Sequence, residues 1–215
     1  MALPRSLSFQ RLGSGPQVLE VYLCPTCPFS GKIARALSAN VLPLITKGGK
    51  YEGRVSLIPR LYPQPFHYTA QFQCEALVWI GTKYPELYWD YFLQIYEHIE
   101  EFGNVPAQNM TPLQTREKLF SIAQTLLEKN GKLKGPASQV HASFMDSADA
   151  VKRKAGDEYA KAVEAMLKSG VKLGRQNGIH VTPTVLFDGI RDDFVSSSWG
   201  KEEWEDYLAK KMQGI

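Results

Sequence analysis

The chain has 215 residues, of which 44% are hydrophobic, and a formal net charge of +3 at pH 7. This length suits one domain with an insertion or two small domains, and the apolar content is sufficient for a core. Lysines and arginines are spread beside aspartates and glutamates and form no basic stripe, so the composition gives no support for nucleic-acid binding.

No apolar run approaches the roughly 18 residues that a membrane span needs, and the segment before Pro16 has no signal-peptide core. Three cysteines in a chain of this size do not make a disulfide framework. We therefore expect a cytoplasmic protein with neither a membrane nor a nucleic-acid partner. The sequence gives no basis for assigning an oligomeric state.

The most informative segment follows the apolar run over residues 18–23, which predicts a strand. Cys24 and Cys27 close this run, and a helical pattern begins at Pro28. A thiol at a strand-to-helix junction lies where free backbone N–H groups and the helix dipole favour the thiolate. The segment therefore indicates redox or thiol-transfer chemistry.

Two arrangements of the thiol site fit this segment. Cys24 and Cys27 could form a dithiol of the C-x-x-C kind, or Cys27 could start the helix as the nucleophile, with Ser30 in the partner position. Proline is favoured at the first position of a helix, so Pro28 favours Cys27 as the N-cap and thus the second arrangement.

The rest of the chain alternates between strand and helix patterns. A second strand over 54–61 completes a βαβ unit with parallel strands, and a strand over 181–187 is followed by a hairpin turn and a terminal helix over 199–212. Between them, helices are expected over 71–84, 86–102, 113–129, a short segment after Pro136, and 155–176. The fold class is therefore α/β, with residues 1–66 and 178–215 in one domain and residues 67–177 in an inserted helical domain.

Pro183 lies inside the last long predicted strand, where it removes one donor of the hydrogen-bond ladder. An edge position would explain it. With a helix-capping cysteine upstream, we favour a cis bond between Thr182 and Pro183 beside the nucleophile. The backbone of Thr182 would then be free to pair with an extended thiol substrate.

Together these segments resemble the DsbA-like branch of the thioredoxin superfamily, and the resemblance covers nearly the whole chain. It rests on Cys27-Pro28-Phe29-Ser30 after an apolar strand, on the helical insertion, and on Val181-Thr182-Pro183-Thr184-Val185. In addition, Gln64-Pro65-Phe66-His67 is similar to a segment of non-secreted eukaryotic members.

The resemblance implies a thioredoxin-like fold with an all-helical insertion and Cys27 as the nucleophile. It places the substrate beside Pro28 and Phe29 and opposite a cis-proline loop formed by Thr182 and Pro183. The expected function is that of a thiol–disulfide oxidoreductase. Its expected substrate is a thiol or disulfide, in a protein or a glutathione conjugate, with no tightly bound cofactor and no metal.

The chain departs from this branch at Ser30, where typical disulfide oxidoreductases have their second cysteine. A hydroxyl cannot complete disulfide exchange, so Cys27 and Ser30 alone cannot oxidise protein thiols. Either Cys24 acts as the resolving thiol, or Cys27 is a monothiol with glutathione as co-substrate and Ser30 as hydrogen-bond donor to its sulfur. The alternatives are a kappa-class-like glutathione transferase or isomerase, for which a serine is expected at position 27, and a redox-inactive binding module.

The sequence assigns no catalytic role to the remaining cysteine, histidine and lysine candidates. Cys74 lies among apolar helical residues and is expected in the core. His180 lies three residues before Pro183 and could approach the site, but we favour an ordinary loop histidine; Lys32 would add positive charge near the nucleophile if its side chain pointed there. His67 pairs with neither Cys24 nor Cys27 at a recognised zinc spacing.

Overall fold

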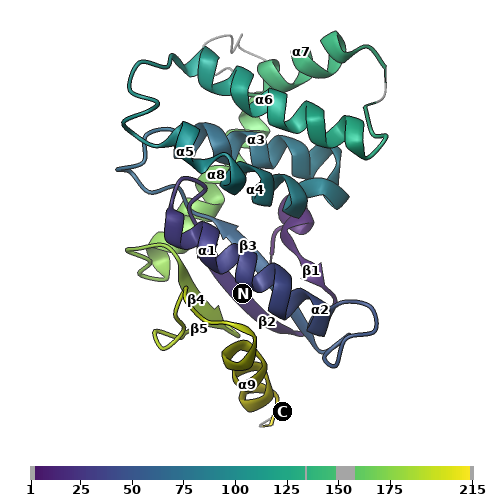
Figure 1. Ribbon diagram of the computed structural model, residues 1–215, viewed down its shortest axis with the longest axis vertical. Coiled ribbons are helices and arrows are strands. Elements are labelled where there is room, and N and C mark those ends of the chain that lie inside the picture. Colours follow the sequence, from purple (N-terminus) through teal and green to yellow (C-terminus); the bar gives the residue numbers. More distant parts are fainter. Residues whose placement is uncertain (1–2, 134, 149–157, 214–215) are drawn as a thin grey trace.

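The computed structural model describes residues 3–133, 135–148 and 158–213. A five-stranded sheet lies at one end of the molecule, and most of the helices gather at the other (Figure 1). The strands are β1 (Leu12–Gly13), β2 (Gln17–Leu23), β3 (Val55–Leu61), β4 (Thr184–Phe187) and β5 (Ile190–Arg191). The helices described are α1 (Pro28–Ala36), α2 (Leu42–Ile45), α3 (Ala70–Lys83), α4 (Tyr88–Glu97), α5 (Ile99–Phe102), α6 (Pro112–Lys129), α7 (Ala137–Ala148), α8 (Glu158–Gln176) and α9 (Lys201–Met212).

Strand β2 is the centre of the sheet, whose order is β1-β3-β2-β4-β5. It runs parallel to β3 and antiparallel to β4, while the short strands β1 and β5 form antiparallel edges. Helices α1 and α2 connect β2 to β3, so the predicted βαβ unit is confirmed. The carboxyl end of β2 leads directly into α1, and this junction carries the two cysteines.

Alternate residues of β2 face opposite sides of the sheet, as the two-residue period of a strand requires. Leu19, Val21 and Leu23 belong to the main apolar core. On the other face, a smaller buried cluster consists of Tyr22, Tyr62, Ile179 and Leu186. Both faces of the central strand are therefore covered, which fixes its position and that of the thiols at its end.

The α/β fold class is confirmed, but some predicted boundaries are wrong. The helix expected over 86–102 is a 3-10 turn over Pro85–Leu87 followed by α4 and α5, with a break at His98. The last long strand begins at Thr184 and so excludes Pro183, because a proline has no N–H for the ladder. Residues 155–157 of the helix expected over 155–176 lie outside the described residues.

The N-terminal 3-10 helix over Arg5–Gln10 and the strand β1 were not predicted, because both are too short to show a hydrophobic period. Helices α3 to α8 all lie between β3 and β4 in the chain. The division at residues 66/67 and 177/178 stays a prediction. None of the described helices has the length and apolar character needed to cross a membrane.

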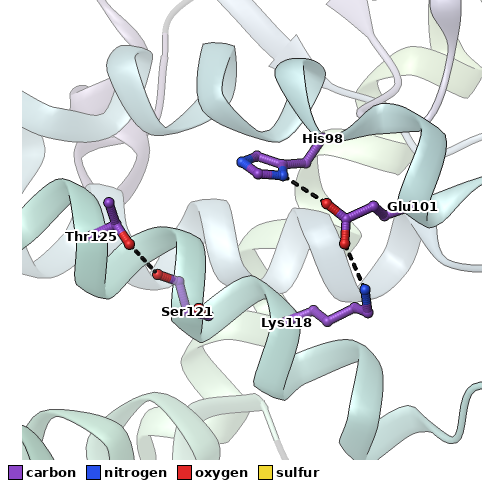
Figure 2. A network of polar contacts seen from close by, with 5 residues as sticks. All are labelled: His98, Glu101, Lys118, Ser121 and Thr125. Carbon is purple, nitrogen blue, oxygen red and sulfur yellow. Dashed lines mark hydrogen bonds and ion pairs between the residues drawn. The ribbon is translucent and has the colours of Figure 1, made fainter.

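Figure 2 shows a polar network that joins α5 to α6 on the surface of the helical region. The Glu101 carboxylate accepts from Lys118 Nζ at 2.5 Å and contacts His98 Nδ1 at 2.7 Å. Lys118 and His98 together hold the pKa of Glu101 below its ordinary value.

We expect Glu101→Gln to lower the free energy of unfolding by less than about 1 kcal/mol at pH 7, because exposed ion pairs contribute little. A lowered carboxyl pKa stabilises the folded state above the unfolded pKa, and this contribution disappears as the pH falls through the folded pKa. The difference between the wild type and the variant should therefore vanish in acid. Urea unfolding at several pH values measures it, and a difference that grows toward acid would contradict the assignment.

Candidate functional site

Cys27 is the N-cap of α1, and Pro28 occupies the first turn, as the proline position predicts. The Cys27 side chain is largely buried, with the residue 6% exposed. Its Sγ donates to the backbone carbonyl of Thr182 at 3.4 Å, and the bond between Thr182 and Pro183 is cis. The helix start and the Thr182–Pro183 loop, which are far apart in sequence, therefore meet at the Cys27 sulfur.

Cys24 lies at the end of β2 and is completely buried. The backbone N–H of Cys27 donates to the carbonyl of Cys24 at 3.0 Å, which closes a four-residue turn. In such a turn the Cα atoms of the first and last residues lie within about 7 Å of each other. A disulfide needs a Cα–Cα distance of no more than about 7 Å, so the turn is compatible with a bridge between Cys24 and Cys27. Cys24 and Cys27 also share a small buried cluster with Ala70, and both are free thiols.

The Cys24 sulfur has two polar neighbours from the segment that follows β3. His67 Nδ1 lies 3.3 Å from Sγ, and the backbone N–H of Gln64 donates to Sγ at 3.4 Å. Burial raises the pKa of Cys24 to about 11, and the Gln64 N–H opposes this increase. His67 is only half-buried, and desolvation lowers its pKa.

The contact between Cys24 and His67 was not predicted from the sequence. Cys24 and His67 are 43 positions apart, and their contact joins the end of β2 to the segment after β3 through the parallel pairing of the two strands. The only signal was the resemblance of Gln64-Pro65-Phe66-His67 to a family segment. Among the described residues, no group of three or more metal-binding side chains is present.

Ser30 is buried in the first turn of α1, and its Oγ accepts from the backbone N–H of Cys24 at 3.2 Å. In this contact Ser30 acts as an acceptor, while the Cys27 sulfur faces the Thr182 carbonyl; the hydrogen bond from Ser30 to the sulfur, expected for the monothiol alternative, stays a prediction. Ser30 therefore holds the turn that carries both thiols.

Residues of the helical region also fix the turn. The buried Thr26 donates to Gln73 Oε1 at 2.6 Å, and the Tyr96 hydroxyl donates to the carbonyl of Cys24 at 3.3 Å. Gly31 allows the Tyr96 ring to approach α1, since a Cβ at Gly31 would lie 3.0 Å from that ring. The thiol turn is thus held from α3 and α4 as well as from the sheet.

Apolar side chains are exposed around this buried site. Phe29 is 64% exposed on α1, Val181 is exposed beside Thr182, and Phe66 is exposed next to His67. The hydroxyl of Thr182 is buried and has no hydrogen-bond partner among the described residues. The segments that carry the thiol site and the Thr182–Pro183 loop therefore each present an exposed apolar side chain.

A groove of about 430 Å³ lies between the segment after β3 and the carboxyl-terminal part of α8 with the loop that follows it. Phe66 and His180 are among the residues that line this groove. Phe66 is thus an aromatic residue of the segment before α3 that faces the groove. The side chain of Lys32 is directed toward the segment before α9, where its Nζ donates to Ser198 Oγ at 2.9 Å.

Several solved structures are similar to this one over nearly their whole length. A candidate protein-disulfide isomerase from Pseudomonas syringae is 24% identical, with 94% of this chain and 99% of that chain covered and a TM-score of 0.71. BdbD of Bacillus subtilis, in its oxidised form, is 14% identical over 95% of this chain and 92% of its own, with a TM-score of 0.63. DsbA of Chlamydia trachomatis is 18% identical over 99% of this chain and 94% of its own, with a TM-score of 0.60.

No protein-family model and no curated protein sequence matches the chain. The structural likenesses establish the fold, which is the DsbA-like form of the thioredoxin fold with a helical insertion. The resemblance noted in the sequence is therefore confirmed at the level of the fold.

Proposed function

We propose that this chain, which has the DsbA-like form of the thioredoxin fold, is a thiol–disulfide oxidoreductase with Cys27 as nucleophile and Cys24 as resolving thiol. The observation that carries the proposal is the closed turn that places both sulfurs in one buried cluster, with Cys27 at a helix start facing the Thr182 carbonyl. A thiolate at the first turn of a helix is stabilised by free N–H groups and the helix dipole.

The proposed reaction has two exchange steps. In the first, the Cys27 thiolate attacks one sulfur of a substrate disulfide, and the other substrate sulfur leaves with the bonding electron pair and takes up a proton. In the second, the Cys24 sulfur attacks Cys27, the bond from Cys27 to the substrate breaks, and a bond between Cys24 and Cys27 forms. The substrate gains two electrons and two protons, and the two cysteines lose them; the reverse sequence oxidises a dithiol substrate.

A second candidate is a monothiol mechanism with glutathione as co-substrate. The observation that favours it is the burial of Cys24, which raises the pKa of that thiol to about 11 and so slows its attack at neutral pH. A mixed disulfide on Cys27 would then persist until an external thiol resolved it. The cysteine at position 27 disfavours the kappa-class-like transferase, which would need a serine there.

The substrate proposed for either mechanism is a disulfide or a mixed disulfide in an extended segment. Its backbone would lie beside Thr182 and Pro183, and its apolar side chains would contact Pro28 and Phe29. Both Phe29 and Val181 are exposed at this place. The cytoplasmic location expected from the sequence stays part of this proposal.

Cys24→Ala tests whether Cys27 is the nucleophile and Cys24 the resolving thiol. We expect this variant to attack a peptide disulfide at the wild-type rate but to retain the peptide on Cys27, because the resolving sulfur is missing. Intact-mass measurement after mixing reports the retained peptide, and we expect its lifetime to rise about a hundredfold or more.

Cys74→Ala is the matched control, since Cys74 is a buried thiol with no part in the proposed exchange. This control should release the peptide like the wild type. A Cys24→Ala variant that also releases it at the wild-type rate would eliminate Cys24 as the resolving thiol and favour external resolution.

A further inference from the structure

The buried Cys24 thiol has a base at hydrogen-bond distance that the exchange steps above do not use. His67 Nδ1 lies 3.3 Å from Cys24 Sγ. In the tautomer that carries its proton on Nε2, Nδ1 is an acceptor for the Cys24 S–H. The other polar neighbours of this sulfur are backbone N–H groups, that of Gln64 at 3.4 Å and those of Thr26 and Cys27, which are donors and stabilise negative charge on sulfur.

The surroundings explain why Cys24 needs such a base. A thiol whose pKa is raised to about 11 by burial is almost entirely protonated at neutral pH, and only the thiolate attacks a disulfide. The half-buried imidazole has its pKa lowered by desolvation, so it is neutral and able to accept a proton under the same conditions. Its partial exposure lets it exchange that proton with water.

Among the residues that the structure describes, the other ionisable side chains around Cys24 are acids, and none of them can replace His67 as the base. They come from three helices: Cys27 from the start of α1, Cys74 from α3 and Tyr96 from α4. Burial raises the pKa values of Cys74 and Tyr96, so both stay protonated. The Tyr96 hydroxyl also donates to the Cys24 carbonyl, not to its sulfur.

We propose that His67 is the general base that takes the thiol proton of Cys24 as Cys24 displaces the substrate from Cys27. This inference rests on the proposed function and assigns the residue that makes its second step possible. The Cys24 S–H proton moves to Nδ1 while the sulfur electron pair forms the bond to Cys27. The substrate thiolate leaves with the electron pair of the broken bond, and His67 returns the proton to that thiolate or to water.

The test separates the two steps in time. One equivalent of an aromatic disulfide that releases a coloured thiolate is mixed with the reduced protein. The first release reports the attack by Cys27, and the second reports the displacement by Cys24; peptide mapping of the product confirms the bridge between Cys24 and Cys27. The variant is His67→Asn, whose side-chain oxygen can replace Nδ1 as an acceptor but is not a base.

In the wild type, the rate of the second release should become independent of pH once His67 has lost its proton, which occurs at a lower pH than for an ordinary histidine because desolvation lowers its pKa. In His67→Asn it should rise about tenfold per pH unit toward pH 11, because hydroxide must then supply the thiolate. At pH 7 the second release should be at least about a hundredfold slower in the variant, with the first release unchanged.

Two results would overturn the role of His67 while leaving the proposed function standing. One is a second thiolate release that is equally fast in His67→Asn and in the wild type. The other is a second release in the wild type whose rate rises tenfold per pH unit, a result that the wild-type protein alone can give. If the wild-type protein releases one equivalent of thiolate and forms no disulfide between Cys24 and Cys27, both Cys24 as the resolving thiol and His67 as its base are eliminated. A wild type that releases none would overturn the proposed function itself.

Discussion

Cys27→Ser is expected to abolish thiol–disulfide exchange, with a loss of about a thousandfold or more to the uncatalysed background. A serine hydroxyl forms no disulfide, and no other described thiol occupies an equivalent place: Cys24 is completely buried and Cys74 lies in the core. The measurement is the steady-state reduction of a peptide disulfide with an external dithiol as electron donor.

Cys74→Ser provides the control, because it removes a thiol from the main apolar core and not from the small cluster that holds Cys27. It should retain exchange activity, even if its stability is somewhat lower. Residual exchange of more than a few per cent in Cys27→Ser would mean that Cys24 can act as the primary nucleophile, which would reverse the roles assigned to the two cysteines.

The largest expected effect on stability comes from the ion pair between Glu20 in β2 and Arg60 in β3. Arg60 Nε donates to Glu20 Oε2 at 2.7 Å, and the two side chains are 3% and 1% exposed. Glu20→Ala would leave the guanidinium buried without a counter-charge, which costs about 3–5 kcal/mol. We expect this loss in the free energy of unfolding, measured by urea titration at pH 7.

The paired variant with Glu20→Leu and Arg60→Leu is the informative comparison. It removes both charges, so the cost of desolvating them disappears together with the attraction between them. The free energy of unfolding should therefore lie well above that of Glu20→Ala. An equal loss in the single and paired variants would show that packing around β2 and β3, not the unpaired charge, determines the effect.

The sequence predicted those parts of the fold that local patterns determine. Pro28 after Cys27 indicated the start of α1, and the apolar runs around it indicated the parallel pair β2 and β3; the structure has both. Thr182 and Pro183 were expected beside the nucleophile because Pro183 lies inside a strand pattern and a helix-capping cysteine precedes it in the chain, and the Thr182 carbonyl does contact the Cys27 sulfur.

The sequence did not predict contacts that depend on how distant segments pack. His67 contacts Cys24 because β3 ends beside β2. This contact depends on the pairing of the two strands and cannot be inferred from the sequence separation of the two residues. The direction of Lys32 toward Ser198 was equally hidden, since a helical pattern gives the face of a residue but not the loop that faces it. The contact of Ser30 with the backbone N–H of Cys24 was likewise not predicted.

The most direct test of the account is to incubate the reduced protein with oxidised glutathione, block the remaining thiols and map the peptides. We predict a disulfide between Cys24 and Cys27, with Cys74 blocked as a free thiol and glutathione on Cys27 only as a short-lived intermediate. A stable glutathione adduct on Cys27, with Cys24 recovered as a free thiol, would contradict Cys24 as the resolving partner.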